Sequence, residues 1–166
     1  MTQCHKTGQF YLTKCLRNAC PGVPKYTKKL NAEVSLLEES VRYWLELAQY
    51  DMSSAKVMQK GRKYFYVGFM CHQTIEKALK AYHAGYLKET PPYIHNLIRL
   101  SELTDLLSVF NQKQHRTVIS LNPLNIETRY PIRKDELTLL LTKQYCKQLI
   151  NDTEELLIWI KNRLSE

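Results

Sequence analysis

Apolar residues recur at spacings of three and four along the stretch that begins at Val41. Three to four residues complete about one helical turn, so this spacing predicts a helix with one apolar face. The helix is expected to end at Gly61, because glycine readily adopts the left-handed conformation that often follows a last helical turn. The apolar face consists of Val41, Trp44, Leu45, Ala48, Met52 and Ala55.

A second helix is predicted from about Tyr64 to Gly85, and it is apolar on two sides. Larger side chains form one side, at Phe65, Phe69, His72, Ile75, Leu79 and Tyr82. Smaller residues form the other side, at Ala78, Ala81 and Gly85. A helix with more than one apolar face usually contacts several neighbours, so we expect this helix at the centre of the fold.

The pattern that follows predicts shorter helices and a crossing segment. Pro91 and Pro92 cannot continue a helix, and a third helix then carries apolar residues from Leu97 to Phe110. A short fourth helix is expected over residues 115–121. The stretch 121–131 is interpreted as a non-helical segment that crosses the bundle.

The last helix is predicted to start near Lys134, because Asp135 and Glu136 would complement the positive end of its dipole. One face stays apolar as far as Leu164, so about 30 residues at 1.5 Å each would form a rod of about 45 Å. No strand-like alternation appears after residue 40. The sequence therefore predicts an all-α fold, a four- to five-helix up-and-down bundle with a long C-terminal helix.

The bundle is expected to span residues 41–164. Residues 1–40 contain Pro21-Gly22-Val23-Pro24 and no sustained periodicity, which predicts a basic, partly disordered N-terminal arm. An over-long start of the reading frame is the alternative. No apolar run approaches the roughly 18 residues of a membrane span, and no secretory signal is apparent, so we expect a cytoplasmic protein without membrane contact.

The formal charge of the chain is +8. Such an excess favours phosphate-bearing partners by long-range attraction, although a solvated basic surface without a partner would have the same composition. The five cysteines are interpreted as free thiols, with Cys71 and Cys146 inside helices. Cys4, His5, Cys15 and Cys20 match no usual zinc spacing. We therefore expect no metal and no cofactor.

Several segments together resemble the HEPN domain, named for higher eukaryotes and prokaryotes nucleotide-binding. The main one is Cys71-His-Gln-Thr-Ile-Glu-Lys-Ala-Leu-Lys-Ala81, preceded by Trp44 and Asp51 and followed by Tyr-Ile-His95 and Arg129-Tyr130-Pro131. The resemblance covers about residues 41–164. It implies a helical bundle, commonly a homodimer, that often works with a small nucleotidyltransferase in toxin–antitoxin or related modules.

The ribonucleases of this family use an Arg-x4-6-His motif, and no histidine of this chain has an arginine at that distance before it. Metal-free RNA cleavage needs a proton-transfer group and a cation at one phosphate. The leading hypothesis is therefore a non-catalytic binding module. The alternatives are a divergent ribonuclease that uses His95 or His115 with Arg129, and a dimeric scaffold without a ligand.

The second helix also carries a polar stripe at helical spacing, which we interpret as a candidate site for a nucleotide or RNA phosphate. If the crossing segment packs against this stripe, the candidate residues are Gln73, Glu76, Lys77, Lys80, Arg129, Tyr130 and Arg133. The structural alternative, which we favour, is that Glu76 pairs with Lys80 or Arg129 only to hold the fold. His95 is interpreted as a cap or tether, because no partner that would orient it is apparent.

Four residues lie off the main apolar faces and are candidates for a dimer interface: Tyr43, Leu47, Tyr50 and Trp159.

Overall fold

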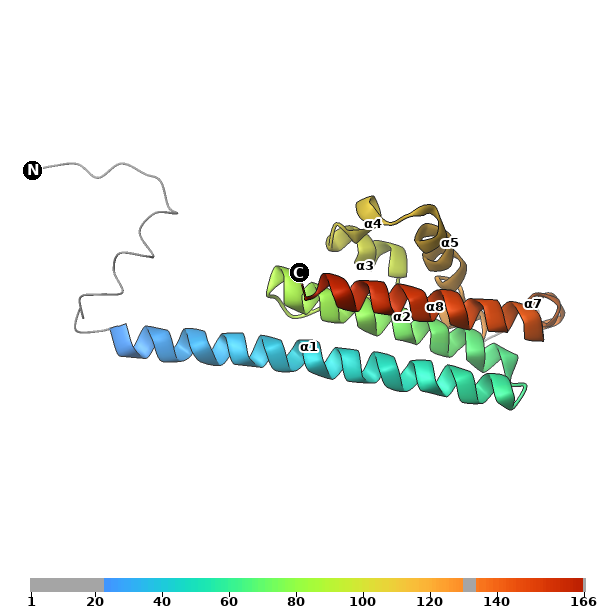
Figure 1. Cartoon of the computed structure of the whole chain (residues 1–166), viewed down its shortest axis with the longest axis horizontal. Helices are drawn as coiled ribbons and strands as arrows, with labels where there is room; N and C mark the ends of the chain where they lie inside the picture. The colour runs from blue at the N-terminus through green and yellow to red at the C-terminus, as the bar shows by residue number, and fades with distance from the viewer. Residues whose placement is uncertain (1–22, 130–133, 166) are drawn as a thin grey trace, which may run out of the picture. The chain divides into compact units, whose positions relative to one another are not determined.

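The computed structural model describes residues 23–129 and 134–165, except for the side chains of residues 23–34 and 134. Every regular element in these ranges is an α-helix, which confirms the predicted fold class (Figure 1). Residues from Leu36 onward form one compact unit. The helices are α1 Val23–Lys60, α2 Tyr64–Leu87, α3 Leu97–Leu103, α4 Leu106–Val109, α5 Gln112–Leu121, α6 Leu124–Glu127, α7 Lys134–Leu140 and α8 Lys143–Arg163.

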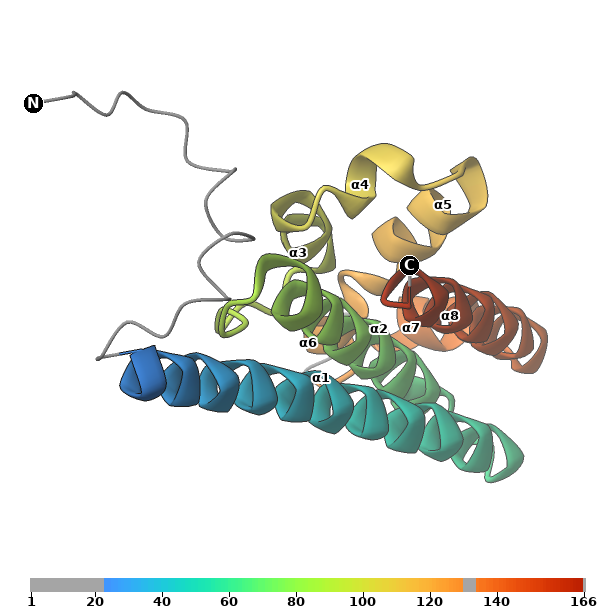
Figure 2. The same cartoon turned by 60° about the vertical axis from the view of Figure 1, so that its left-hand side comes forward.

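Helix α2 lies at the centre of the bundle, as predicted for the second helix. It contacts α3, α5, α6 and α8, and Figure 2 shows α1 and α8 on different sides of it. Ile75, Ala78 and Leu79 of α2 are fully buried, as a helix surrounded by neighbours requires. Gly68 allows α6 to approach closely, because a Cβ at this position would lie 3.2 Å from Leu124 Cδ1.

The part of α1 that follows Leu36 packs on the bundle through its apolar face. Ala48, Met52 and Ala55 of this face are buried in the core, as predicted. Two ion pairs flank the contact: Asp51 binds Lys77 of α2, and Lys56 Nζ lies 2.5 Å from Glu154 Oε1 of α8. The predicted end of the first helix is also confirmed, because α1 ends at Lys60, but the left-handed residue that follows is Arg62, with a φ of 57°, and not Gly61. No helix in the described ranges is long and apolar enough to cross a membrane.

Two predicted helices are broken in the structure. The helix expected from Leu97 to Phe110 is divided at Asp105, which has a φ of 57° and so ends α3 before α4 begins. The single rod expected from Lys134 to Leu164 is wrong, because α7 ends at Leu140 and a new helix starts after Thr142. The Thr142 side chain accepts a hydrogen bond from Tyr145 N at 3.2 Å, which caps α8. The 21 residues of α8 give a rod of about 32 Å.

The other differences concern residues 23–40 and the crossing segment. α1 begins at Val23, well before Val41, so residues 23–40 are helical where the sequence predicted no regular element. Leu, Glu and Lys make up nine of these 18 residues, and all three have high helix propensity. Residues 1–22 of the predicted arm lie outside the described residues. The crossing segment contains one helical turn, α6, directly after Pro123.

Candidate functional site

The polar stripe of α2 converges on Glu76, whose side chain is almost fully buried. Lys80 Nζ donates a hydrogen bond to Glu76 Oε1 at 2.8 Å from the next turn of the helix. His72 Nε2, on the preceding turn, lies 3.3 Å from Oε2. His95 comes from the loop before α3 and places Nδ1 3.0 Å from Oε1. One carboxylate thus gathers three basic groups, and His72, Glu76, Lys80 and His95 are called the Glu76 cluster below.

Glu76 is ionised over the whole physiological range. Burial alone would raise its pKa, but polar contacts with His72, Lys80 and His95 and the charge of Lys80 outweigh burial and lower the pKa to about 2. The ammonium group of Lys80 also lies 5.2 Å from the centroid of the Trp44 ring, which is a favourable cation–π distance. Trp44 thereby places α1 against the cluster.

His72 is the fully buried member of the cluster. Its Nδ1 lies 3.0 Å from the carbonyl oxygen of Leu121, which can only accept a hydrogen bond, so Nδ1 is the donor. Its Nε2 faces the Glu76 carboxylate, which also can only accept. The 3.3 Å separation from Glu76 is a close polar contact outside hydrogen-bond geometry, so the one hydrogen bond of the ring to a described residue is that to Leu121. The ring links the end of α5 to α2, which is a structural task.

His95 is the accessible member of the cluster, with 64% of its side chain exposed. Its Nδ1 lies within hydrogen-bond distance of both Glu76 oxygens, at 3.0 and 3.1 Å. The carboxylate therefore orients the ring and leaves Nε2 for a ligand. No pattern in the sequence indicated this partner, because Glu76 and His95 meet only when the loop that contains Pro91 and Pro92 folds back onto α2.

The structure separates the other predicted site residues. Lys77 binds Asp51 of α1, and Gln73 is half-buried. Arg129 donates from Nε to the carbonyl oxygen of Asn125 at 2.7 Å, and its guanidinium lies 5.2 Å from the centroid of the Phe69 ring. Phe69 precedes Glu76 by seven residues, about 10 Å along the helix axis. Tyr130 and Arg133 lie outside the described residues.

Three of the four candidate dimer residues share α1. Tyr43 and Tyr50 are exposed, and Leu47 is half-buried. Trp159 of α8 lies elsewhere, because its ring packs edge-on against Phe110 with centroids 5.5 Å apart.

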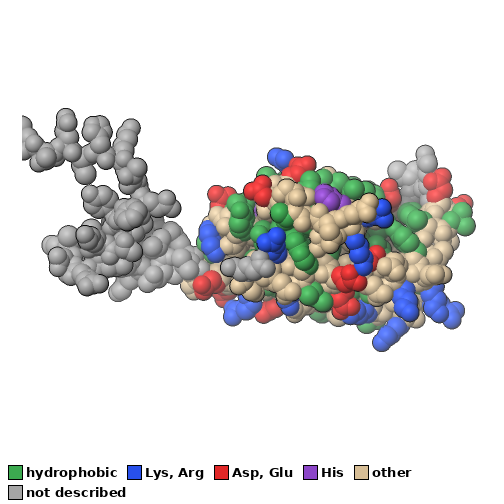
Figure 3. All heavy atoms as spheres, turned by 45° about the horizontal axis from the view of Figure 1, so that its top comes forward, with side chains coloured by type: hydrophobic (Ala, Val, Ile, Leu, Met, Phe, Trp, Pro, Cys, Tyr) green, Lys and Arg blue, Asp and Glu red, His purple; other side chains and the backbone are tan. Residues whose placement is uncertain are grey.

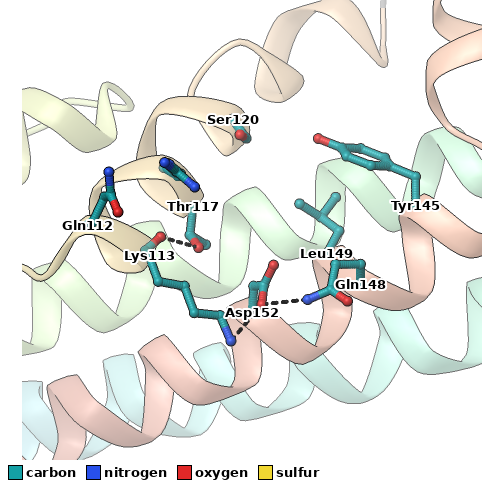
Figure 4. A pocket seen from close by; sticks show the side chains of 9 residues that line it. Gln112, Lys113, Thr117, Ser120, Tyr145, Gln148, Leu149 and Asp152 are labelled. Carbon is teal, nitrogen blue, oxygen red and sulfur yellow. Dashed lines mark hydrogen bonds and ion pairs between the residues drawn. The ribbon is translucent and has the colours of Figure 1, made fainter.

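A polar groove between α5 and α8 has a volume of about 340 Å³ (Figure 4). Lys113 of α5 lies 2.9 Å from Asp152 and 2.7 Å from Glu155, both on α8. Gln148 donates to Asp152 as well, at 2.9 Å. Lys113 binds both carboxylates across the groove, so we interpret these ion pairs as a structural connection between the two helices.

The two cysteines inside the bundle are free thiols and are buried, as expected for packing residues. Burial raises the pKa of Cys71 to about 12 and that of Cys146 to about 11. Neither thiol therefore forms a nucleophilic thiolate near neutral pH.

Comparison with known proteins establishes the family. The model of the HEPN domain matches residues 41–163, so the chain belongs to the HEPN family. The search of curated proteins found no match.

Two solved structures are similar in fold. The chain resembles ST0689, an archaeal HEPN homologue, with a TM-score of 0.60 and 21% sequence identity over 75% of this chain and 97% of that one. It also resembles TT1696 from Thermus thermophilus, with a TM-score of 0.59 and 20% identity over 74% of this chain and 96% of that one. At these identities the likeness concerns the fold.

Proposed function

We propose that this HEPN protein is a non-catalytic binding module whose ligand carries a phosphate group, as a nucleotide or RNA does. The observation that carries the proposal is the exposed imidazole of His95, which buried Glu76 holds in one orientation. With Nδ1 bound to the carboxylate, a protonated ring can donate from Nε2 to a phosphate oxygen. The net charge of +8 favours the approach of such an anion.

Binding is favoured over cleavage because both lysines of the stripe already have carboxylate partners. Lys80 binds Glu76, and Lys77 binds Asp51. A metal-free cut in RNA needs a cation at the same phosphate as the proton-transfer group. Among the described residues of the stripe, Lys77 and Lys80 would each have to leave a carboxylate partner to supply that charge.

Calorimetry with ATP, GTP and a short oligouridylate tests the proposal. We expect binding by the full chain, because Glu76 orients the exposed ring and leaves Nε2 for the ligand. His95→Ala should weaken the affinity by on the order of tenfold or more, the value of one charge-assisted hydrogen bond. Tyr93→Ala is the matched control, since Tyr93 is fully exposed in the same loop. Absence of heat with all three ligands would contradict the proposal and support a ligand-free scaffold.

We further propose that the module acts as a homodimer through an apolar ridge on α1. Four large side chains recur every seven residues along this helix, and all are exposed: Leu36, Tyr43, Tyr50 and Val57. Seven residues are about two turns, so the four side chains lie on one face and extend over about 32 Å. Half-buried Leu47 borders this ridge. An exposed apolar surface of this length is typical of a protein interface.

The oligomeric state in solution tests the ridge. Sedimentation velocity should show a dimer for the wild type and a shift to monomer for Tyr50→Glu, because a buried interface does not accommodate an unpaired charge. Tyr93→Glu places the same charge on an exposed tyrosine outside the ridge and should leave the dimer intact. A wild-type monomer at micromolar concentration would refute this interface.

A divergent ribonuclease is the second candidate, and the Glu76–His95 contact is the observation that favours it. A carboxylate that fixes Nδ1 of a histidine is the arrangement that orients a general base. The roles would differ from those expected from the sequence, because Arg129 lies beside Phe69 and His115 packs edge-on against Phe110. RNA cleavage by the wild type that disappears in His95→Ala, while Arg129→Ala retains it, would replace the non-catalytic proposal.

The family resemblance is the ground for one more proposed partner, a small nucleotidyltransferase. A gene for such a protein beside the gene of this chain would support the proposal, and co-elution of the two proteins after co-expression would test it directly. Separate elution at micromolar concentrations would argue against a stable complex.

A further inference from the structure

The turn between α1 and α2 lies in a stretch of sequence that contains cations and no acidic residue. From Met52 to Ile75 the sequence contains Lys56, Lys60, Arg62 and Lys63 and no Asp or Glu. Lys56 is paired with Glu154 of α8. The other three are exposed, and none of them forms an ion pair with a residue that the structure describes. In Figure 3, Lys and Arg side chains gather at the lower right, the end at which Figure 1 shows this turn.

A cleft of about 320 Å³ opens beside these cations, and it is called the turn cleft below. Tyr66 is 55% exposed, whereas Tyr64 and Phe65 are half-buried and pack against the core. Packing holds the rings of Tyr64 and Phe65 in place, and the Tyr66 ring is open to solvent, so a planar ligand could stack in the cleft at a small ordering cost. None of the described side chains that line the cleft is acidic; they belong to Arg62, Lys63, Tyr64, Phe65, Tyr66, Thr138 and Leu141.

The chemistry of the turn cleft selects a ligand that is both planar and anionic. Single-stranded nucleic acids meet both conditions, because unstacked bases bind aromatic side chains while phosphates bind Lys and Arg. A duplex keeps its bases stacked inside. An anionic membrane offers charge, but insertion into it uses protruding apolar side chains, not a hollow. The volume lies near the lower limit of ligand pockets, about 300–1,000 Å³, which suits one nucleotide unit.

We propose that the turn cleft is a second binding site, which holds one base of a single-stranded nucleic acid on its aromatic wall. Arg62 and Lys63 bind the flanking phosphates. The inference extends the proposed function, since both sites take phosphate-bearing ligands, but it uses different residues.

The turn cleft and the Glu76 cluster are too far apart for one nucleotide. Phe65 precedes Glu76 by eleven residues on α2, which is about 17 Å along the helix axis. At roughly 3.4 Å per nucleotide of a stacked strand, on the order of five nucleotides would span this separation. Each site can therefore be removed without touching the other.

Fluorescence anisotropy of the full chain with a labelled oligouridylate of about twelve nucleotides tests the turn cleft. Arg62→Ala combined with Lys63→Ala should weaken binding at least about tenfold and reduce the salt slope by about 1.4, because each phosphate contact with a single strand contributes about 0.7. Tyr66→Leu should weaken binding by on the order of tenfold, since it removes the stacking ring but keeps an apolar side chain.

Lys143→Ala combined with Lys147→Ala is the matched control, because it removes the same charge from exposed positions on α8. An equal loss in this control would mean that only net charge matters, and the turn cleft would be refuted. Retention of full affinity in the Arg62/Lys63 variant would refute it as well. Binding of the wild type to anionic vesicles, but not to the oligouridylate, would assign the turn to a membrane and overturn the proposal.

A parallel titration of His95→Ala separates this inference from the proposed function. Loss of ATP and oligouridylate binding only in His95→Ala would support the Glu76 cluster and refute the turn cleft. Loss of oligouridylate binding only in the Arg62/Lys63 variant, with no ATP binding by the wild type, would support the turn cleft and refute the Glu76 cluster as a ligand site. If both sites contribute, each variant should lose part of the strand affinity.

Discussion

Glu76→Gln tests whether a buried carboxylate holds the centre of this bundle together. The pKa of Glu76 falls from 4.5 to about 2 in the folded protein. A difference of roughly 2.5 units at about 1.4 kcal/mol each corresponds to about 3 kcal/mol of stability near neutral pH. Loss of one partner from a buried ion pair typically costs about 3–5 kcal/mol, and Lys80 would lose its partner here. We therefore expect Glu76→Gln to lower the free energy of unfolding by about 3 kcal/mol.

The lowered pKa of Glu76 also predicts how this stabilisation depends on pH. Because the pKa is lower in the folded state, the stabilisation is complete above the unfolded value of 4.5 and disappears as the pH falls towards about 2. The wild type should lose about 1 kcal/mol of this contribution by pH 4 and about 2 kcal/mol by pH 3. Glutamine cannot titrate, so the gap in the free energy of unfolding between wild type and variant should narrow to about 1 kcal/mol at pH 3.

Urea denaturation at pH 6, 4 and 3, followed by circular dichroism, measures this gap. Glu154→Gln is the matched control, since it makes the same chemical change in a half-exposed pair with Lys56 and should cost less than about 1 kcal/mol. A gap below about 1 kcal/mol at pH 6 would show that the cluster does not stabilise the fold. A gap that is the same at pH 6 and pH 3 would show that the carboxylate charge is not its cause.

The remaining predictions concern burial. Iodoacetamide at pH 8 should modify Cys71 and Cys146 only after unfolding, because both thiols are buried and their pKa values are raised to about 12 and about 11; peptide mass mapping of native and urea-treated protein would check this. Leu79→Ala should lower the free energy of unfolding by about 2–5 kcal/mol, because this side chain is fully buried in α2, whereas Leu139→Ala at an exposed position should change it by less than about 0.5 kcal/mol. Equal midpoints of the two variants in urea would contradict this account of the core.

Much of the helical framework could be predicted from local pattern. The apolar face that begins at Val41 and the two-sided face around Ile75 each depend on residues within a few turns of one another, and both predicted helices are present as α1 and α2. The breaks at Asp105 and Thr142 could not be predicted, because the apolar pattern does not mark them. At both places the apolar spacing continues, but Asp105 has a left-handed backbone and Thr142 caps the start of a new helix.

The order of residues along the chain determined that this protein is all-helical and that α2 lies at its centre, because both follow from periodicity within single helices. Only the tertiary structure decided which groups meet at the candidate site. The sequence suggested that Glu76 pairs with Lys80 or Arg129; in the structure Lys80 and His95 bind it, while Arg129 lies beside Phe69. The contact between Glu76 and His95 depends on the path of a loop over 19 residues, and that path follows from the packing of α3 on α2, which no local pattern encodes.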